Sequence, residues 1–218
     1  VRFEACGGHF ALSLDGVGEG FPESGQPHTL EFKTINTKKF KALKAKGLQE
    51  VHPVYWAQCQ VGMHLSNLNR CAFIVVCKET DELYMERIKL DEAEAIKLIA
   101  KAESIVFEDN PPPRLSEDMT DWRCKFCPYW AVCHGCKIPE AHCRTCAHAT
   151  PERDGSWSCA KSHDFGEVCQ DHLFIPQMMP KGWEVLDARM GWVEYHDEDG
   201  EVVRNFQNSE ELHKSRMK

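Results

Sequence analysis

Three side chains near the start of the chain have the types and spacing for metal chemistry: Asp15, Glu31 and Lys33. In an extended segment Glu31 and Lys33 project to the same face, and Phe32 between them is expected in the core. Asp15 ends a neighbouring alternating segment, on its polar face. Two carboxylates that converge at a sheet edge are costly unless a cation lies between them. The pattern therefore predicts that Asp15 and Glu31 bind Mg²⁺ or Mn²⁺, which prefer hard oxygen ligands.

A cation in this position would lower the pKa of a bound water and stabilise charge on a phosphate during its transfer. Lys33 would then orient the attacking water or neutralise the developing negative charge. This D…ExK pattern is weak when taken alone, because acidic strand ends with a lysine nearby are common in folded proteins. Whether the pattern marks a metal site therefore depends on the elements around it.

Cysteines form the second group of side chains with chemical potential. The chain has twelve of them, most of them packed in close pairs between Cys124 and Cys169. No secretory signal stands at the N-terminus, so metal ligation in a reducing compartment fits this spacing better than disulfides do. The alternative is a set of buried cysteines without a ligand.

The cysteines divide into two sets by spacing. Cys124, Cys127 and Cys133 form C-x2-C-x5-C, in which a close pair and a third thiolate can hold one metal; Cys136 is a local candidate for the fourth ligand, and Cys6 a remote one. The second set follows the pattern C-x2-C-x12-C-x9-C, which resembles a short zinc ribbon. Its members are Cys143, Cys146, Cys159 and Cys169, and His148, His163 or His172 could each replace one thiolate. Cys59, Cys71 and Cys77 sit in helix or strand patterns and are expected in the core.

Alternation and glycine positions predict the elements that carry Asp15 and Glu31. Residues 1–15 read as two strands that turn at Gly7-Gly8, and Gly16 begins a loop. Residues 29–35 form a further strand. A helix is expected over residues 37–46, with Phe40 and Leu43 inward and Gly47 as its stop.

Pro53 suits the first turn of another helix. One face of this helix is predicted to be apolar, and it consists of Val54, Ala57, Val61, Leu65 and Leu68. The other face shows Tyr55, Gln58 and Gly62. A buried strand at 71–77, a partner strand at 83–90 and a helix at 91–107 follow. Ala93, Ile96, Ile99 and Ala100 are expected to face inward on that helix.

The element order predicts an α/β fold with a mixed β-sheet flanked by helices, followed by a small cysteine-rich metal-binding region. The predicted core spans residues 1–110. Residues 111–138 form a linker, beginning at Pro111-Pro112-Pro113, and the first cysteine cluster. Residues 139–218 hold the second cysteine set and a hairpin that turns at Asp199-Gly200.

Charge is distributed unevenly along the chain. The net charge of −8 argues against a generally basic nucleic-acid coat. Between Glu31 and Glu50 there is no acid, and Lys38, Lys39 and Lys41 are among the lysines there. They form either a solvated helix face or a local phosphate-binding patch. No apolar run approaches the length of a membrane span, so a cytoplasmic protein is expected.

Motif order around Glu31 resembles the PD-(D/E)xK nuclease superfamily. The resemblance rests on Leu30-Glu-Phe-Lys-Thr34 after a hairpin that ends in Asp15-Gly16. The helix Tyr55-Trp-Ala-Gln-Cys-Gln-Val-Gly-Met63 is similar to that of lambda exonuclease and its YqaJ-like relatives, where a Tyr-x-x-Gln helix packs beside the catalytic strand. The similarity covers residues 1–107. Leu14 stands where the superfamily often has Pro.

The resemblance implies a restriction-endonuclease-like core. Gln58 would order the site or contact backbone phosphate, and Tyr55 would lie near DNA. The superfamily places a further acid or His on an upstream helix, so we expect the natural protein to continue ahead of Val1. The set Cys124, Cys127 and Cys133 resembles the cysteines of iron–sulfur nucleases in the same superfamily. This implies a [4Fe–4S] cluster, although zinc stays open at that position.

These patterns lead to a divalent-metal-dependent DNA nuclease, expected to be an exonuclease of phage-type or bacterial recombination, replication or repair. Its partners would be DNA and a recombination or replication protein. The alternative is a non-catalytic zinc or iron–sulfur module that binds nucleic acid or a replication partner. The intact set of Asp15, Glu31 and Lys33 favours the enzyme. A pure zinc-ribbon scaffold would leave the first half of the chain without a role.

Overall fold

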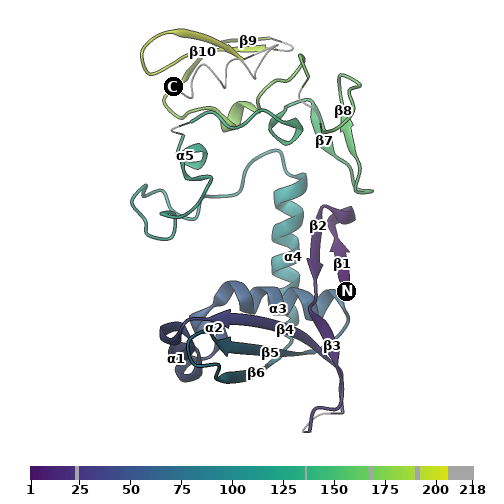
Figure 1. Ribbon diagram of the computed structural model, residues 1–218. Helices are drawn as coiled ribbons and strands as arrows, with labels where there is room; N and C mark the ends of the chain where they lie inside the picture. The colour runs from purple at the N-terminus through teal and green to yellow at the C-terminus, as the bar shows by residue number, and fades with distance from the viewer. Residues whose placement is uncertain (23–24, 136, 167–168, 190–191, 206–218) are drawn as a thin grey trace. The chain divides into compact units, whose positions relative to one another are not determined.

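The computed structural model describes residues 1–22, 25–135, 137–166, 169–189 and 192–205. The chain divides into two compact units (Figure 1). The first unit comprises residues 1–107 with 153–155. The second comprises residues 108–152 and the chain from 156 onward. The fold is mixed α/β, as the element order predicts.

The first unit begins with an antiparallel hairpin of β1 (Arg2–Ala5) and β2 (Phe10–Ser13). A short 3-10 turn, η1 (Cys6–Gly8), joins the two strands, and Gly7 and Gly8 adopt φ values of 69° and 105°. Side chains rarely tolerate such values, so the predicted Gly-Gly turn is confirmed. Gly16, in contrast, begins a short strand, β3 (Gly16–Gly18), and not a loop.

A four-stranded sheet in the order β3-β4-β5-β6 forms the centre of this unit. The other strands are β4 (His28–Ile35), β5 (Arg70–Cys77) and β6 (Leu83–Lys89). β4 and β5 are parallel, with Glu31 opposite Phe73, and the remaining pairs are antiparallel. A parallel pair needs a crossover, which the three helices between β4 and β5 supply.

The first crossover helix, α1 (Thr37–Lys46), has the predicted bounds. The side chain of Asn36 caps it by accepting the N–H of Lys39 at 2.9 Å. Phe40 and Leu43 are buried, and Gly47 ends the helix with a φ of 79°. This helix could be predicted because its cap, inner face and stop are all local in sequence.

The inner faces of the next helices differ from prediction. After α2 (Leu48–Val51), α3 (Pro53–Leu65) buries Val61 as predicted but leaves Val54 76% exposed, and it also buries Cys59, Met63 and Gly62. A Cβ on Gly62 would lie 2.9 Å from Leu14, so the Gly62 side of α3 is also covered. Because α3 packs on both the sheet and the β1–β2 hairpin, a single apolar stripe did not describe it.

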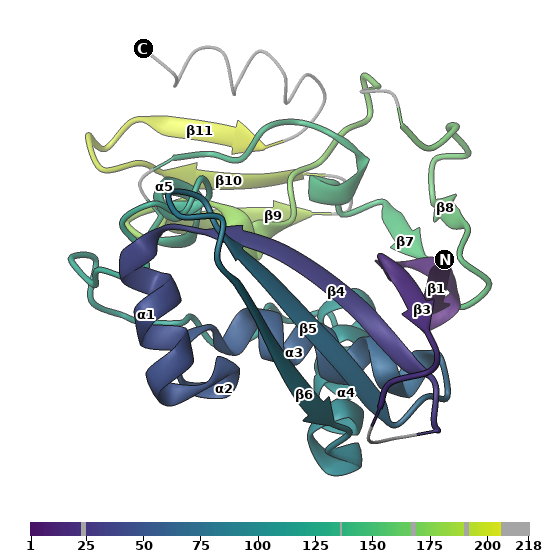
Figure 2. The same ribbon diagram turned by 60° about the horizontal axis from the view of Figure 1, so that its bottom comes forward.

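The helix α4 (Glu92–Phe107) buries Ala95 and leaves Ile96 53% exposed, with Ala93 and Ala100 also exposed. The predicted inward face is therefore wrong. The helix packs against α3 and not on the sheet, so a small residue such as Ala95 occupies the contact. Figure 2 shows α3 and α4 behind the strands β4, β5 and β6.

The two faces of the sheet have different surroundings. The buried cluster lies on the face that carries Glu31 and Lys33; it consists of Ile35, Phe40, Leu43, Leu48, Cys59, Met63, Cys71, Phe73, Val75, Cys77 and Ile88. The predicted core positions of the three cysteines in this cluster are confirmed. Phe32 projects from the opposite face and is 50% exposed, so its predicted place in the core is wrong. The alternation was right, but the helices cover the Glu31 face.

The second unit holds short elements and a small sheet. They are α5 (Trp130–Cys133), η2 (Cys143–Thr145), β7 (Ala149–Pro151), β8 (Trp157–Cys159), η3 (Pro176–Met178), β9 (Glu184–Arg189), β10 (Trp192–His196) and β11 (Val202–Asn205). β9, β10 and β11 form an antiparallel sheet. The predicted turn at Asp199-Gly200 is confirmed, since the Gly200 N–H donates to Asp197 O at 3.0 Å. Throughout the described residues, every helix is too short or too polar to cross a membrane.

Candidate active site and cysteine loops

The structure brings Asp15, Glu31 and Lys33 together beside β4. The Lys33 ammonium donates to Glu31 Oε1 and forms an ion pair with it. Asp15 Oδ2 accepts the backbone N–H of Phe32 at 2.8 Å, which holds this carboxylate next to the strand. Glu31 is 3% exposed, whereas Asp15 is exposed. One buried and one open carboxylate therefore flank a lysine at a single place on the sheet.

The charges at this place act on each other. Burial raises the pKa of the Glu31 carboxyl, and the charge of Asp15 adds to this, while Lys33 and a hydrogen bond from Gln58 oppose it. For Lys33, burial works to lower the pKa. The hydrogen bond to Glu31 and the charges of Glu31, Asp15 and Tyr55 outweigh burial, so the pKa is raised. Lys33 is consequently a permanent cation at neutral pH.

Helix α3 supplies two further side chains. The side-chain amide of Gln58 forms a hydrogen bond with the Glu31 carboxylate. The Lys33 ammonium lies over the Tyr55 ring, 5.2 Å from its centroid. Because Tyr55 and Gln58 are three positions apart on a helix, they share the face that meets β4. Both residues of the Tyr-x-x-Gln motif thus touch the Glu31–Lys33 pair.

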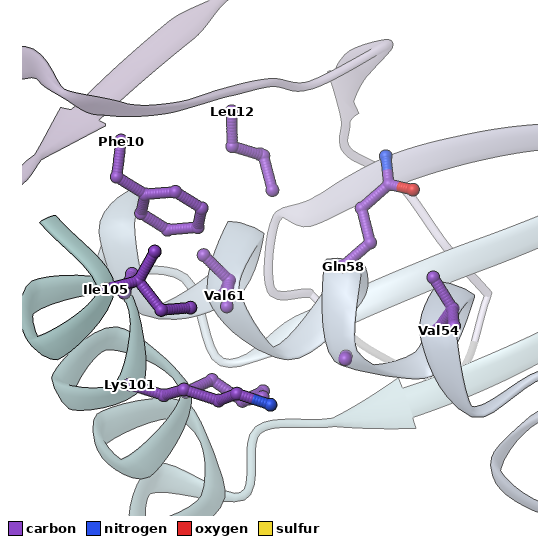
Figure 3. A pocket seen from close by; sticks show the side chains of 10 residues that line it. Phe10, Leu12, Val54, Gln58, Val61, Lys101 and Ile105 are labelled. Atoms are coloured by element: carbon purple, nitrogen blue, oxygen red, sulfur yellow. The ribbon is translucent and has the colours of Figure 1, made fainter. Parts of the chain in front are cut away.

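An open apolar cavity of about 350 Å³ borders Gln58 on its other side (Figure 3). Its walls come from β2, α3 and α4 and include Phe10, Leu12, Val54, Val61, Lys101 and Ile105. Gln58 is therefore common to the cavity and to the carboxylate site.

Three lysines of α1 are exposed, and one of them acts on a residue beside the Glu31–Lys33 pair. Lys38, Lys39 and Lys41 are exposed. The charge of Lys39 acts on His52, whose ring lies 5.1 Å from the Tyr55 ring. The positive charge of α1 therefore acts on a ring that lies beside Tyr55. His52 was not among the predicted site residues; it precedes the first residue of α3, three positions before Tyr55.

Two other lysines of α1 form ion pairs with glutamates. Lys44 Nζ is 3.6 Å from Glu82 Oε1, and Lys46 Nζ is 2.6 Å from Glu50 Oε1. The basic character of this helix is therefore partly neutralised at its C-terminal end. The three exposed lysines nearer its start form the remaining positive surface.

The polar groups fit a divalent cation by ligand type. Asp15 and Glu31 offer hard carboxylate oxygens, which Mg²⁺ and Mn²⁺ prefer. Within the described ranges, however, no three His, Cys, Asp or Glu side chains form a ready metal-binding group. Two protein carboxylates with waters and substrate phosphates are nevertheless enough for a magnesium site.

The first cysteine loop lies in the second unit. The N–H of Cys127 donates to the Cys124 carbonyl at 2.9 Å, and α5 ends at Cys133. Burial raises the pKa of Cys124, to which the charges of Asp121, Cys133 and Cys127 contribute. These three thiols thus gather in one loop. Cys136 lies outside the described residues, and Cys6 is half-buried in the turn of the first unit.

The second cysteine set also gathers in the second unit. Burial raises the pKa of Cys146, and the charges of Cys169 and Cys159 act in the same direction. Hydrogen bonds from the backbone of Leu173 and His148 oppose this shift. The Gly166 N–H donates to Cys143 Sγ at 3.3 Å. The predicted members of this set are therefore close neighbours.

Comparison with known proteins finds no matching family model, no matching curated protein and no matching solved structure.

Proposed function

We propose that the first unit is a divalent-metal-dependent DNA nuclease with a restriction-endonuclease-like core. The observation that carries the proposal is the contact of Glu31 with both Lys33 and Gln58, next to the Asp15 carboxylate, which accepts the N–H of Phe32 on the same strand as Glu31. A buried carboxylate, an open carboxylate and a cationic amine are the groups that phosphodiester hydrolysis requires.

The roles follow from the contacts. Asp15 and Glu31 would hold the cation, which supplies a more acidic water and stabilises charge on the phosphate. Gln58 keeps the Glu31 carboxylate oriented through its hydrogen bond. Lys33 remains charged, so its ammonium group can form a hydrogen bond with the attacking water or with a phosphate oxygen. The Tyr55 ring lies against the Lys33 ammonium and limits its movement.

DNA would approach over α1. Lys38, Lys39 and Lys41 are exposed; the charge of Lys39 acts on His52, and the His52 ring packs against Tyr55 at the site. Lysines on a helix surface suit contacts with backbone phosphates and do not read bases. A triple Lys→Ala variant should bind all DNA sequences more weakly and show a flatter salt dependence. An unchanged salt slope would make these lysines a solvated helix face.

The test of catalysis uses the full chain with Mg²⁺ or Mn²⁺ and labelled DNA. Lys33→Ala and Glu31→Ala should each reduce cleavage by about 10³-fold or more, because each removes charge from the reacting centre. Lys44→Ala and Glu82→Ala are matched controls, since they break an exposed ion pair of the same residue types. Circular dichroism checks folding. Cleavage at the wild-type rate in both site variants would refute the assignment.

A second candidate is a nucleic-acid-binding module that does not cut. It is favoured by the Glu31–Lys33 ion pair, which neutralises the buried carboxylate without a cation. Under this alternative, the wild-type chain would bind DNA but leave it intact with either metal. Replacing Lys33 with Ala would then change the stability of the first unit, because it leaves the buried Glu31 carboxylate without its partner.

We also propose that Cys124, Cys127 and Cys133 hold a metal centre, either a [4Fe–4S] cluster or zinc. Their gathering in one loop supports ligation, and thiolates accept both kinds of centre. Visible absorption and iron content of anaerobically purified protein separate the two. A colourless protein with zinc and no iron would exclude the cluster.

The nuclease would serve recombination, replication or repair, with a protein partner of those systems.

A further inference from the structure

The backbone brings four cysteines of the second unit together although they are far apart in sequence. Cys143 and Cys146 flank the η2 turn, in which the Cys146 N–H donates to the Cys143 carbonyl at 3.1 Å. The chain then enters the β7–β8 hairpin, where Ala149 pairs with Cys159. The hairpin therefore returns Cys159 to the end of the Cys143–Cys146 turn.

A later segment closes on the same turn from another direction. Cys146 forms an isolated antiparallel bridge with Phe174, and the Ala147 N–H donates to Leu173 O at 2.7 Å. Cys169 lies just ahead of this bridge, in a turn where the His172 N–H donates to its carbonyl at 3.2 Å. Backbone pairing therefore brings the three stretches that carry the four cysteines next to one another.

Backbone groups of the same turns lie against the sulfurs. Cys143 Sγ accepts the N–H of Gly166 at 3.3 Å. Metal binding requires the deprotonated form of each thiol. Unbalanced negative charges would repel each other in this half-buried place, and a bound cation removes that repulsion.

We infer that Cys143, Cys146, Cys159 and Cys169 bind one Zn²⁺ in a closed, four-thiolate structural site. Four sulfur ligands with a close C-x2-C pair are typical of structural zinc, which prefers tetrahedral coordination. The thiols do not form a ready metal-binding group among the described residues, so zinc binding is expected to reorient them. Ligation also releases the protons of any neutral thiols.

The nearby histidines have other contacts. His163 Nε2 lies 2.7 Å from Asp171 Oδ2. His172 Nε2 is 3.1 Å from the His142 carbonyl and 3.4 Å from the Thr145 hydroxyl. These ring contacts favour four thiolates over a set in which His163 or His172 replaces a cysteine.

Zinc would fasten the β7–β8 hairpin and residues 169–174 to the Cys143–Cys146 turn. Leu173 and Phe174 are the buried large apolar side chains of these described stretches, so metal ligation would add to their cohesion. The inference does not depend on nuclease activity. It predicts that Glu31→Ala keeps its zinc while losing cleavage.

The experiment measures zinc in the full chain by elemental analysis and follows thiol accessibility by pulse alkylation and mass spectrometry. Zinc should protect Cys143, Cys146, Cys159 and Cys169 as a group. A strong thiol-competing chelator should expose all four together, whereas Cys6 should react equally in both states. Titration with Co²⁺ should give the visible absorption of a tetrahedral thiolate complex.

Substitutions separate this site from its neighbours. Cys159→Ser and Cys169→Ser should each lower the zinc content by one equivalent, and Cys127→Ser and His163→Gln should leave this site loaded. If the two serine variants do not fold, the alkylation pattern of the wild-type chain decides. Independent labelling of the four thiols, or loss of this zinc in His163→Gln or His148→Gln, would overturn the four-thiolate assignment.

Discussion

The two units of the chain differ in how much apolar surface each of them buries inside itself. In the first, large apolar side chains such as Phe40, Leu43, Leu48 and Phe73 are almost completely buried between the sheet and its helices. In the second, the described buried cluster is limited to Ile138, Phe174, Met179 and Tyr195, and β9 is exposed along its whole length. Eight of the twelve cysteines belong to this second unit.

This difference in buried apolar surface indicates which interactions stabilise each unit. Burial of apolar area contributes about 25 cal/mol per Å², so a broad buried cluster can hold the first unit without ligands. A small cluster with exposed strands gains less from burial, and small domains of this kind are usually stabilised by disulfides or metals. We therefore expect the first unit to depend on packing and the second on its thiolates.

Metal removal should give the largest effect. Structural zinc contributes on the order of 10 kcal/mol to the folding of small metal-binding segments. A chelator that strips the second unit should make residues 139–205 sensitive to a brief protease treatment, while residues 1–107 stay protected. Mass spectrometry of the fragments measures both. Equal protection of the second unit with and without chelator would show that packing alone holds it.

A large truncation in the first unit tests the opposite half of the comparison. Phe73→Ala should lower the free energy of unfolding of this unit by about 3–5 kcal/mol, because it leaves a cavity in a buried cluster. Urea unfolding measures the loss, and zinc content should not change. Phe32→Ala is the matched control on the neighbouring strand, where the side chain is 50% exposed. A similar loss in both variants would contradict the assignment of the two sheet faces.

The same contrast explains how far sequence reasoning could go. Helix α1 was predictable because Asn36, Phe40 and Gly47 carry local signals for its start, inner face and end. The buried faces of β4, α3 and α4 were not predictable, since the apolar residues Phe32, Val54 and Ile96 are at least half exposed. Alternation gives the period of an element, but only the packing of distant segments decides which face is buried.

The candidate site shows the same division. Asp15, Glu31, Lys33 and Gln58 were named from types and spacing, and the structure brings them together. Their catalysis and metal binding stay predictions. His52 was missed, because its place beside Tyr55 depends on the turn between α2 and α3.

A smaller effect is expected at the start of α1. Asn36→Ala removes the acceptor of the Lys39 N–H and should lower the stability of the first unit by about 1 kcal/mol. Asn36→Asp keeps an acceptor and should retain most of that stability. Thermal unfolding followed by circular dichroism compares the two. Equal losses would mean that the cap contributes nothing beyond the side chain's size.

The smallest effect concerns pH. Burial lowers the pKa of His52, and the positive charge of Lys39 adds to this. The unfolded chain therefore takes up a proton near pH 6.5, while the folded first unit takes it up at lower pH. Protonation thus favours the unfolded state, and stability is kept above pH 7 and lost as the pH falls below 6.5.

The expected loss for the first unit between pH 7.5 and 5.5 is below about 1 kcal/mol. His52→Gln should remove this part of the pH dependence, and Lys39→Ala should reduce it. Hydrogen exchange of β4 and β5 reports the first unit separately, which matters because acid also protonates thiolates and releases zinc from the second unit. A pH response that His52→Gln leaves unchanged would assign it to other groups. It would also remove the electrostatic link between α1 and the candidate site, because that link passes through the His52 ring.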